Sequence, residues 1–217
     1  MKKGVLFLWM MALSAISAMS ATNEDISKVA SHDVITYLQG CVAQIPQPSD
    51  FNLSDRASVS RAELGTPVPL LAVNDGADTI AATTQVSSIS VSANRWYVPV
   101  SVDGTARFFI AVSEMGKRGG LMRSASGFAY LAAEYGRIVQ AWPGHAIALI
   151  TVPSTGRYFF TITDLGKENI TAMRTPAERS SIIAPHAAPP PQDYSVLGTV
   201  SDALATVRSD KAAGGVK

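Results

Sequence analysis

Three pairs of basic residues recur at nearly the same spacing along the chain and are the first candidates for a binding site. The pairs are Arg107 with Arg157, Lys117 with Lys167, and Arg123 with Arg174. A guanidinium or ammonium group binds carboxylates and phosphates. If the segments that carry the pairs are related by pseudo-symmetry, we expect these cations to line one surface that binds a polyanion or carboxylates. The alternative is that they are charged residues that protect two aromatic strands from aggregation, and the near-zero net charge favours this alternative.

The pairs belong to a sequence match within the chain. Residues 107–117 align without gaps on residues 157–167, with identity at the leading Arg, at one Phe and at the final Gly-Lys. Alternation of apolar residues in strands explains the aromatic and aliphatic matches, but it does not explain the Arg and the Gly-Lys. The match therefore favours a duplicated hairpin, since self-similarity at a fixed spacing is typical of repeats.

A duplicated hairpin makes a prediction about side-chain direction. Successive side chains of a strand point to opposite faces of the sheet, so Phe109 and Phe159 are expected on the same type of face. Phe108 and Tyr158 are then expected on the opposite face. Chance similarity between two strands permits a slip of one residue, which would reverse each of these directions.

The histidines and the single cysteine do not form a recognisable catalytic or metal-binding motif. The chain contains His32, His145 and His186, and its one Cys is Cys41. No two histidines stand at a zinc-binding spacing, so neither a metal site nor another cofactor is expected. Cys41 and His145 could together form the thiol dyad of a hydrolase, but no glycine-rich cysteine signature surrounds Cys41. We therefore interpret Cys41 as a buried structural residue.

Residues 1–20 have the three regions of a secretory signal peptide. Two lysines follow the first Met, Gly4–Leu13 is almost wholly apolar, and small residues come next. The spacing of Ala18 and Ser20 fits cleavage after Ser20. The apolar run is about half of the roughly 20 residues that a membrane-spanning helix needs. The chain is therefore expected to be exported to a periplasm or to the extracellular space, with no transmembrane segment.

The remaining pattern predicts a globular α+β domain over residues 21–174. Its expected architecture is a single antiparallel sheet of five to seven strands with the duplicated hairpin, packed by two helices. We expect helices over 23–39 and 126–142, and strands over 68–73, 86–91, 96–102, 107–112, 147–152, 157–163 and 168–173. Asp103-Gly104 is expected to form a two-residue hairpin turn. Pro99 lacks an N–H and is expected to leave part of a strand edge unpaired, and residues 115–122 are expected to form a loop.

Composition limits the partners of the chain. It carries 18 Lys and Arg against 17 Asp and Glu, so no strong field attracts nucleic acid. Residues 175–217 include a proline-rich stretch and are expected to form a largely disordered C-terminal arm. These features indicate a non-catalytic binding or inhibitory module whose partner is a protein or a small anionic ligand. The alternatives left open are a hydrolase that uses Cys41 and His145, and a carrier of an apolar ligand held between helix 126–142 and the sheet.

Overall fold

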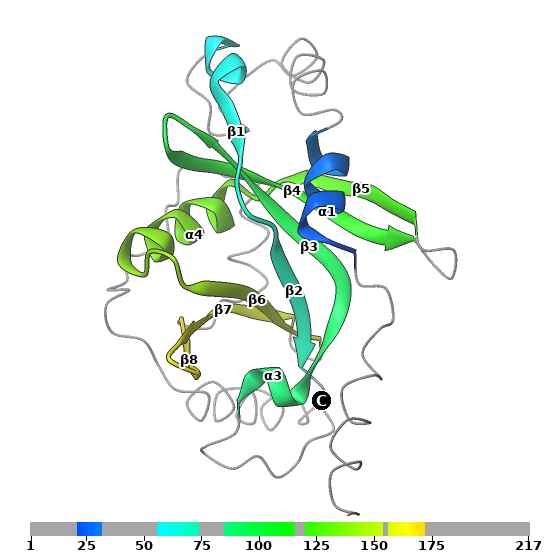
Figure 1. The fold of residues 1–217 in the computed structure, drawn as a ribbon, viewed down its shortest axis with the longest axis vertical. Coiled ribbons are helices and arrows are strands. Elements are labelled where there is room, and N and C mark those ends of the chain that lie inside the picture. Colours follow the sequence, from blue (N-terminus) through cyan, green and yellow to red (C-terminus); the bar gives the residue numbers. More distant parts are fainter. Residues whose placement is uncertain (1–20, 32–55, 74–84, 116–119, 154–155, 172–217) are drawn as a thin grey trace, which may run out of the picture.

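The computed structural model describes residues 21–31, 56–73, 85–115, 120–153 and 156–171. These segments form one sheet with helices on both faces (Figure 1), so the α+β class predicted from the sequence is confirmed. The helices are α1 (Asn23–Ser31), the 3-10 helix η2 (Arg56–Arg61), α3 (Val86–Ile89) and α4 (Ala129–Ala141). The strands are β1 (Ala62–Leu64), β2 (Val68–Val73), β3 (Ser90–Val102), β4 (Thr105–Met115), β5 (Gly120–Gly127), β6 (Ala146–Val152), β7 (Arg157–Asp164) and β8 (Lys167–Ile170). None of the helices in these segments is long and apolar enough to span a membrane.

The sheet consists of two antiparallel three-stranded meanders joined by β2. Its order is β5-β4-β3-β2-β6-β7-β8, and β1 pairs with the last residues of β3. β2 is antiparallel to β3 but parallel to β6, which it contacts through the pairs Leu70–Leu149, Leu71–Ile150 and Ala72–Thr151. The described sheet therefore has eight strands where five to seven were expected, and one of its pairs is parallel.

Two of the hairpins turn through residues with positive φ. The β3–β4 turn has φ values of 52° at Asp103 and 71° at Gly104, and the β7–β8 turn has 48° at Leu165 and 79° at Gly166. Positive φ at both central residues matches the twist of the flanking strands. The predicted Asp103-Gly104 turn is confirmed, whereas the completely exposed Leu165 occupies a conformation in which Asn, Asp or Gly is usual.

β1 and β2 share one edge of β3, and the interruption between them lies opposite Pro99. β2 begins at Val68, which pairs with Tyr97, and β1 ends at Leu64, which pairs with Val100. The N–H of Gly65 donates to the carbonyl oxygen of Pro99 at 2.8 Å. The N–H and the carbonyl of a residue in an antiparallel strand point to the same edge, so the N–H that Pro99 lacks would point to this edge as well. The predicted break in pairing at Pro99 is therefore confirmed.

α4 packs on one side of the sheet, which we call the α4 face. The buried residues of this face include Val68, Leu70, Tyr97, Phe109, Leu131, Ile138, Leu149 and Phe160. The ring of Tyr135 lies 5.5 Å from the ring of Phe109 on β4 and 6.4 Å from that of Phe160 on β7, measured between centroids. β4 and β7 are four strand spacings apart, roughly 19 Å in a flat sheet. One side chain contacts both strands because the sheet curves around α4, and burial raises the pKa of the Tyr135 phenol.

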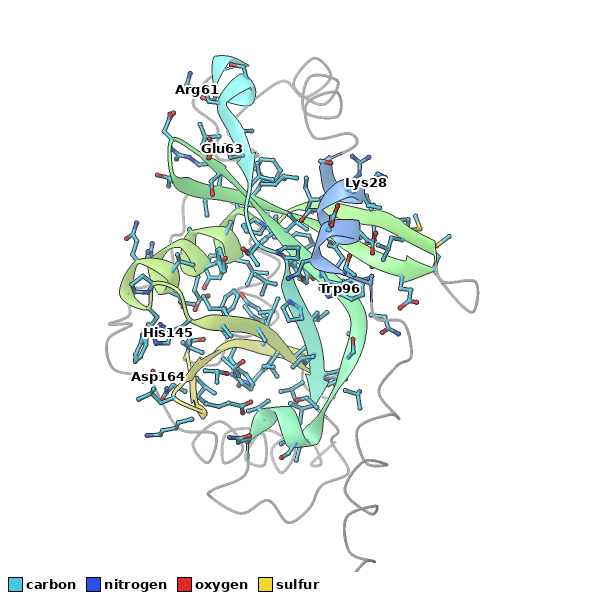
Figure 2. All side chains as sticks on the ribbon, in the orientation of Figure 1. Lys28, Arg61, Glu63, Trp96, His145 and Asp164 are labelled. Atoms are coloured by element: carbon cyan, nitrogen blue, oxygen red, sulfur yellow. The ribbon has the colours of Figure 1, made fainter. Side chains whose placement is uncertain are left out.

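The opposite face carries two apolar layers. α1 covers the first layer, in which Ile26 and Ala30 pack on residues of β3 and β4 that include Trp96 and Phe108. Figure 2 shows Trp96 lying against α1. The second layer contains Val73, Val86, Ile150, Val152, Phe159 and Ile170. Residues that alternate along β2 and β6 therefore belong to cores on opposite sides of the sheet, as the pleat requires.

Thr22 and Asp25 cap the N-terminus of α1. The Asp25 N–H donates to Thr22 Oγ1 at 3.1 Å, and the Thr22 N–H donates to Asp25 Oδ2 at 3.2 Å. This reciprocal pair satisfies two backbone donors that a helix leaves without intrahelical partners. The Thr22 hydroxyl also donates to Asp25 Oδ2 at 2.6 Å. That side-chain bond, followed by the backbone bond, holds the pKa of Asp25 below its ordinary value.

Three predicted elements differ from the structure. Residues 86–89 form α3, and the strand predicted over 86–91 begins only at Ser90. The carboxylate of Glu168 on β8 accepts a hydrogen bond from the Val86 N–H, so a contact from a distant part of the sequence stabilises this short helix. The predicted loop 115–122 contains the end of β4 and, from Gly120, the start of β5. α4 begins at Ala129 because Phe128 has a left-handed φ of 58°. Residues 1–20, Cys41 and the arm 175–217 lie outside the described residues.

The side-chain directions expected from the gapless repeat are not observed. Phe109 packs on the α4 face together with Tyr158. Phe108 and Phe159 lie in the layers of the opposite face. All four rings are buried, so the difference lies in direction and not in exposure.

A bulge in β4 at Arg107 explains this reversal. Val100 and Ile150 occupy matching positions in the repeat, and both point away from α4. Val100 pairs with Phe108, whereas Ile150 pairs with Phe159. The two turns differ by two residues, since Val102 pairs with Thr105 and Val152 pairs with Arg157, and an even difference leaves the faces unchanged. The single extra residue at Arg107 moves every later side chain of β4 to the other face.

Candidate functional site

The structure does not bring Arg107 and Arg157 together. Arg107 lies in a bulge of β4, beside the end of β3. Arg157 is the first residue of β7 and pairs with the last residue of β6. This end of β6 and the start of β3 lie on opposite sides of the same end of β2. The two arginines are therefore near opposite ends of β3.

The other predicted cations are equally dispersed where they are described. Lys167 is exposed at the start of β8. Arg123 pairs with Val112, whose side chain belongs to the layer under α1, so Arg123 is on the face opposite to α4. Lys117 and Arg174 lie outside the described residues. The described members of the three pairs do not line one surface.

His145 forms a pair with a carboxylate at one end of β6. Its Nε2 lies 3.2 Å from Oδ1 of Asp164, the last residue of β7. Figure 2 shows the two side chains next to each other beyond the end of α4. The imidazole also packs edge-on against Trp142, with ring centroids 5.4 Å apart. Both side chains of the ion pair are partly exposed.

Both nitrogens of His145 are engaged in this arrangement. Nδ1 lies 3.1 Å from the carbonyl oxygen of Pro143, which can only accept, so Nδ1 carries a hydrogen. Nε2 faces the Asp164 carboxylate. Both ring nitrogens therefore face protein oxygens, whereas a catalytic base needs a ring nitrogen that faces the nucleophile. Cys41, the other member of the predicted dyad, lies outside the described residues.

α4 contributes a carboxylate that the sequence analysis did not single out. Glu134 is completely buried, although charged side chains are rarely buried unless they have a partner. Within the described ranges, no three His, Cys, Asp or Glu side chains gather as the ligands of a metal ion would.

A second part of the α4 face is not covered by the helix. On β4, the buried core under α4 ends at Ala111, and side chains that point to the same face continue beyond it. We call this surface the open strip, and it consists of Arg95, Ser113, Met115, Met122 and Ser124. Its two apolar side chains are strongly exposed, with exposed fractions of 55% for Met115 and 41% for Met122. Two exposed methionines on neighbouring strands beside an arginine make this surface the candidate binding site.

A chain of hydrogen bonds holds Arg95 in the middle of the open strip. Its Nε donates to Ser113 Oγ at 2.9 Å, and the Ser113 hydroxyl donates to Ser124 Oγ at 2.9 Å. The Ser124 hydroxyl in turn donates to the carbonyl oxygen of Ala111 at 3.3 Å. The three side chains come from β3, β4 and β5, so the whole meander positions one guanidinium.

Register irregularities lie on both sides of this hydrogen-bond chain. Between β2 and β3 the register shifts just before Arg95, where Asn94 has a positive φ of 50°. The Asn94 N–H donates to Ser92 Oγ at 3.1 Å, which stabilises this turn of the backbone. Between β4 and β5 the register shifts at Ser124. Bulges change the direction of neighbouring side chains and are frequent beside functional sites.

The guanidinium of Arg95 keeps two nitrogens for a ligand. Among the described residues, the Nε bond to Ser113 is its one hydrogen bond, and no described carboxylate forms an ion pair with it. A half-buried arginine is ordinarily neutralised by a carboxylate or phosphate. Here the Nη1 and Nη2 edge is available for an anion.

Sequence reasoning passed over Arg95 because it has no counterpart in the repeat. The signal that was present is local: a basic residue precedes the alternating run Trp96–Val102. It does not reveal Ser113 or Ser124, because cross-strand register decides which residues become neighbours. Comparison of the chain with models of protein families, with curated proteins and with solved structures finds no match.

Proposed function

We propose that the chain is an exported, non-catalytic binding module whose open strip binds a protein partner. The observation that carries this proposal is the pair of exposed side chains, Met115 and Met122, beside an arginine that is already fixed in place. Methionine and arginine are enriched at the centres of protein interfaces, and methionine adapts its shape to different partners. Charge complementarity indicates a partner that presents a carboxylate to Arg95. The export of the chain is proposed from the signal-peptide pattern of residues 1–20.

The two other functions have weaker support. A hydrolase that uses His145 as its base would need an accessible ring nitrogen, and both nitrogens are engaged by Pro143 and Asp164. A carrier would need room between α4 and the sheet. The rings of Tyr97, Phe109 and Tyr135 pack against one another there at centroid distances of 5.7 and 5.5 Å.

We also propose that the two hairpins arose by duplication of a single hairpin. The strand order supports it, because one three-stranded meander lies on each side of β2. The matching directions of Val100 and Ile150 also support it. The bulge at Arg107 in the first hairpin, which the second hairpin lacks, would account for the reversed directions in the second strands.

A differential binding experiment tests the proposed surface. The mature chain is immobilised and exposed to the secreted or periplasmic proteins of the organism that produces it. A variant with Met115→Asp and Met122→Asp places two charges on the open strip, and Leu165→Asp is the control because it adds a charge at an exposed turn elsewhere. We expect a protein that is retained by the parent and by the control and is lost with the double variant. Equal retention by all three chains contradicts the proposal.

A further inference from the structure

We propose that Arg95 is a carboxylate-binding site and that the open strip selects a carboxylate attached to an apolar group. This inference rests on the proposed function of the open strip as a binding surface, and it assigns the chemistry of the recognised group. The site consists of the Nη1 and Nη2 edge of Arg95, with Met122 and Met115 beside it. Ser113 is a positioning residue, because it acts on the ligand only through Arg95.

The hydrogen-bond chain determines which edge of the guanidinium faces a ligand. The Nε of Arg95 is bound to Ser113, so the end of the group, with one N–H from each terminal nitrogen pointing in parallel, remains for binding. That geometry matches the two oxygens of a carboxylate and allows two parallel hydrogen bonds. Because Ser113 fixes the group in advance, binding loses less side-chain freedom than it would at an unconstrained arginine.

The hydroxyl groups of Ser113 and Ser124 have no hydrogen left to donate to a ligand. Ser113 donates its hydrogen to Ser124, and Ser124 donates its hydrogen to the Ala111 carbonyl. The donors that remain in this row belong to Arg95. A ligand group that only accepts hydrogen bonds therefore fits, and a neutral amide or hydroxyl fits less well.

Cross-strand pairing places apolar side chains next to the cation. Arg95 pairs with Ser113, and Ser113 pairs with Met122, so the three residues form one row across three strands. Met115 follows Ser113 by two positions and points to the same face. Directly paired residues have Cβ atoms about 5 Å apart, so an aliphatic group attached to the bound carboxylate reaches Met122 and Met115.

Hexanoate is a suitable probe, because it combines one carboxylate with a short aliphatic chain. The ¹⁵N-labelled mature chain is titrated with hexanoate, acetate, hexanol and inorganic phosphate at constant pH and ionic strength. We expect hexanoate to shift the Nε resonance of Arg95 and the amide resonances of Ser113 and Met122. Acetate should bind several-fold more weakly because it lacks the aliphatic chain, and hexanol should leave the Nε resonance unchanged. Phosphate binding as tightly as hexanoate would overturn the preference for an apolar carboxylate.

Three variants separate the roles of the residues. Arg95→Lys should weaken hexanoate binding by about tenfold or more, because an ammonium group cannot form the two parallel bonds. Ser113→Ala should weaken it less, while hexanol binding stays as in the parent. Arg107→Lys, at the other end of the neighbouring strand, is the matched control and should bind like the parent. Unchanged hexanoate binding in Arg95→Lys overturns the inference.

The results also distinguish this inference from the proposed function. If the double methionine variant loses its protein partner while Arg95→Lys binds hexanoate normally, the surface is a binding site but Arg95 is not its carboxylate site. If hexanoate binds through Arg95 but the methionine variant retains every partner, the inference holds and the protein-binding function is contradicted. Competition by hexanoate against the retained protein shows whether the carboxylate belongs to that protein or to a separate small acid.

Discussion

At the scale of single residues, two charged side chains are each held by a neighbouring hydroxyl group. Ser113 orients the guanidinium of Arg95, and Thr22 orients the carboxylate of Asp25. The two charged groups have different roles, because the carboxylate of Asp25 is used within the fold. Asp25 completes the cap of α1, whereas the terminal nitrogens of Arg95 face away from the meander's own hydrogen-bond chain.

The cap of α1 makes a prediction about pH. Because hydrogen bonds from Thr22 lower the pKa of Asp25, the unfolded chain binds a proton there at a pH at which the folded chain does not. The contribution of the cap to stability is therefore present above the ordinary pKa of Asp and is lost as the pH falls through the lowered folded value. We expect Thr22→Ala to raise the pKa of Asp25 and to lower stability at neutral pH more than at about pH 2.

The measurement is an NMR titration of the Asp25 carboxyl carbon, together with urea unfolding at the two pH values. Thr22→Ser keeps the hydroxyl and is the control, which should titrate like the parent. An identical Asp25 titration in Thr22→Ala would show that the capping hydrogen bonds do not lower this pKa.

At the scale of elements, two glycines allow close approaches of different kinds. A Cβ at Gly65 would lie 2.7 Å from Cγ of Pro99, inside the contact distance. A Cβ at Gly136 on α4 would lie 3.5 Å from Cβ of Ala106, which is an ordinary contact. Gly65 is required between β1 and β2 because a side chain would clash with Pro99. Gly136 has room for a side chain and lowers the stability of α4, since glycine has a low helix propensity.

The two glycine-to-alanine substitutions should therefore have opposite signs. We expect Gly65→Ala to destabilise the fold by about 1–3 kcal/mol, since the ring of Pro99 or the backbone must move. Gly136→Ala should stabilise it by about 0.5–1 kcal/mol through helix propensity. Urea unfolding of the parent and the two variants measures both effects. A neutral Gly65→Ala would contradict the close contact, and combining it with Pro99→Ala, which removes the ring Cγ, should relieve most of the loss.

Elements with a strong local pattern could be predicted from the sequence. β2, the Asp103-Gly104 turn and the interruption at Pro99 each depend on a few neighbouring residues, and all are present in the structure. β5 was missed because its pairing with β4 outweighs a composition typical of loops. The parallel pairing of β2 with β6 and the row of Arg95, Ser113 and Met122 depend on which strands become neighbours, and no local pattern contains that information.

At the scale of the whole molecule, the predicted cleavage position lies directly before a structured segment. Ala21 packs against the layer under α1, and Thr22 begins the cap. Cleavage after Ser20 would preserve both, so we expect the mature exported protein to begin at Ala21, within the range Met19 to Thr22. Intact mass and N-terminal sequencing of the exported protein test this expectation. A product that retains Lys2 and Lys3 would contradict it.

The single junction between the two meanders has a consequence for the order in which the molecule forms. Within each meander, every strand pairs with one that is close in sequence. Leu70 and Leu149, by contrast, are separated in the chain by three strands and α4. Closing so long a loop is entropically costly, and nonlocal pairing slows folding. We therefore expect the two meanders to form before β2 pairs with β6, and that pairing to be the slow step of folding. α4, which contacts strands on both sides of that junction, then locks the halves together.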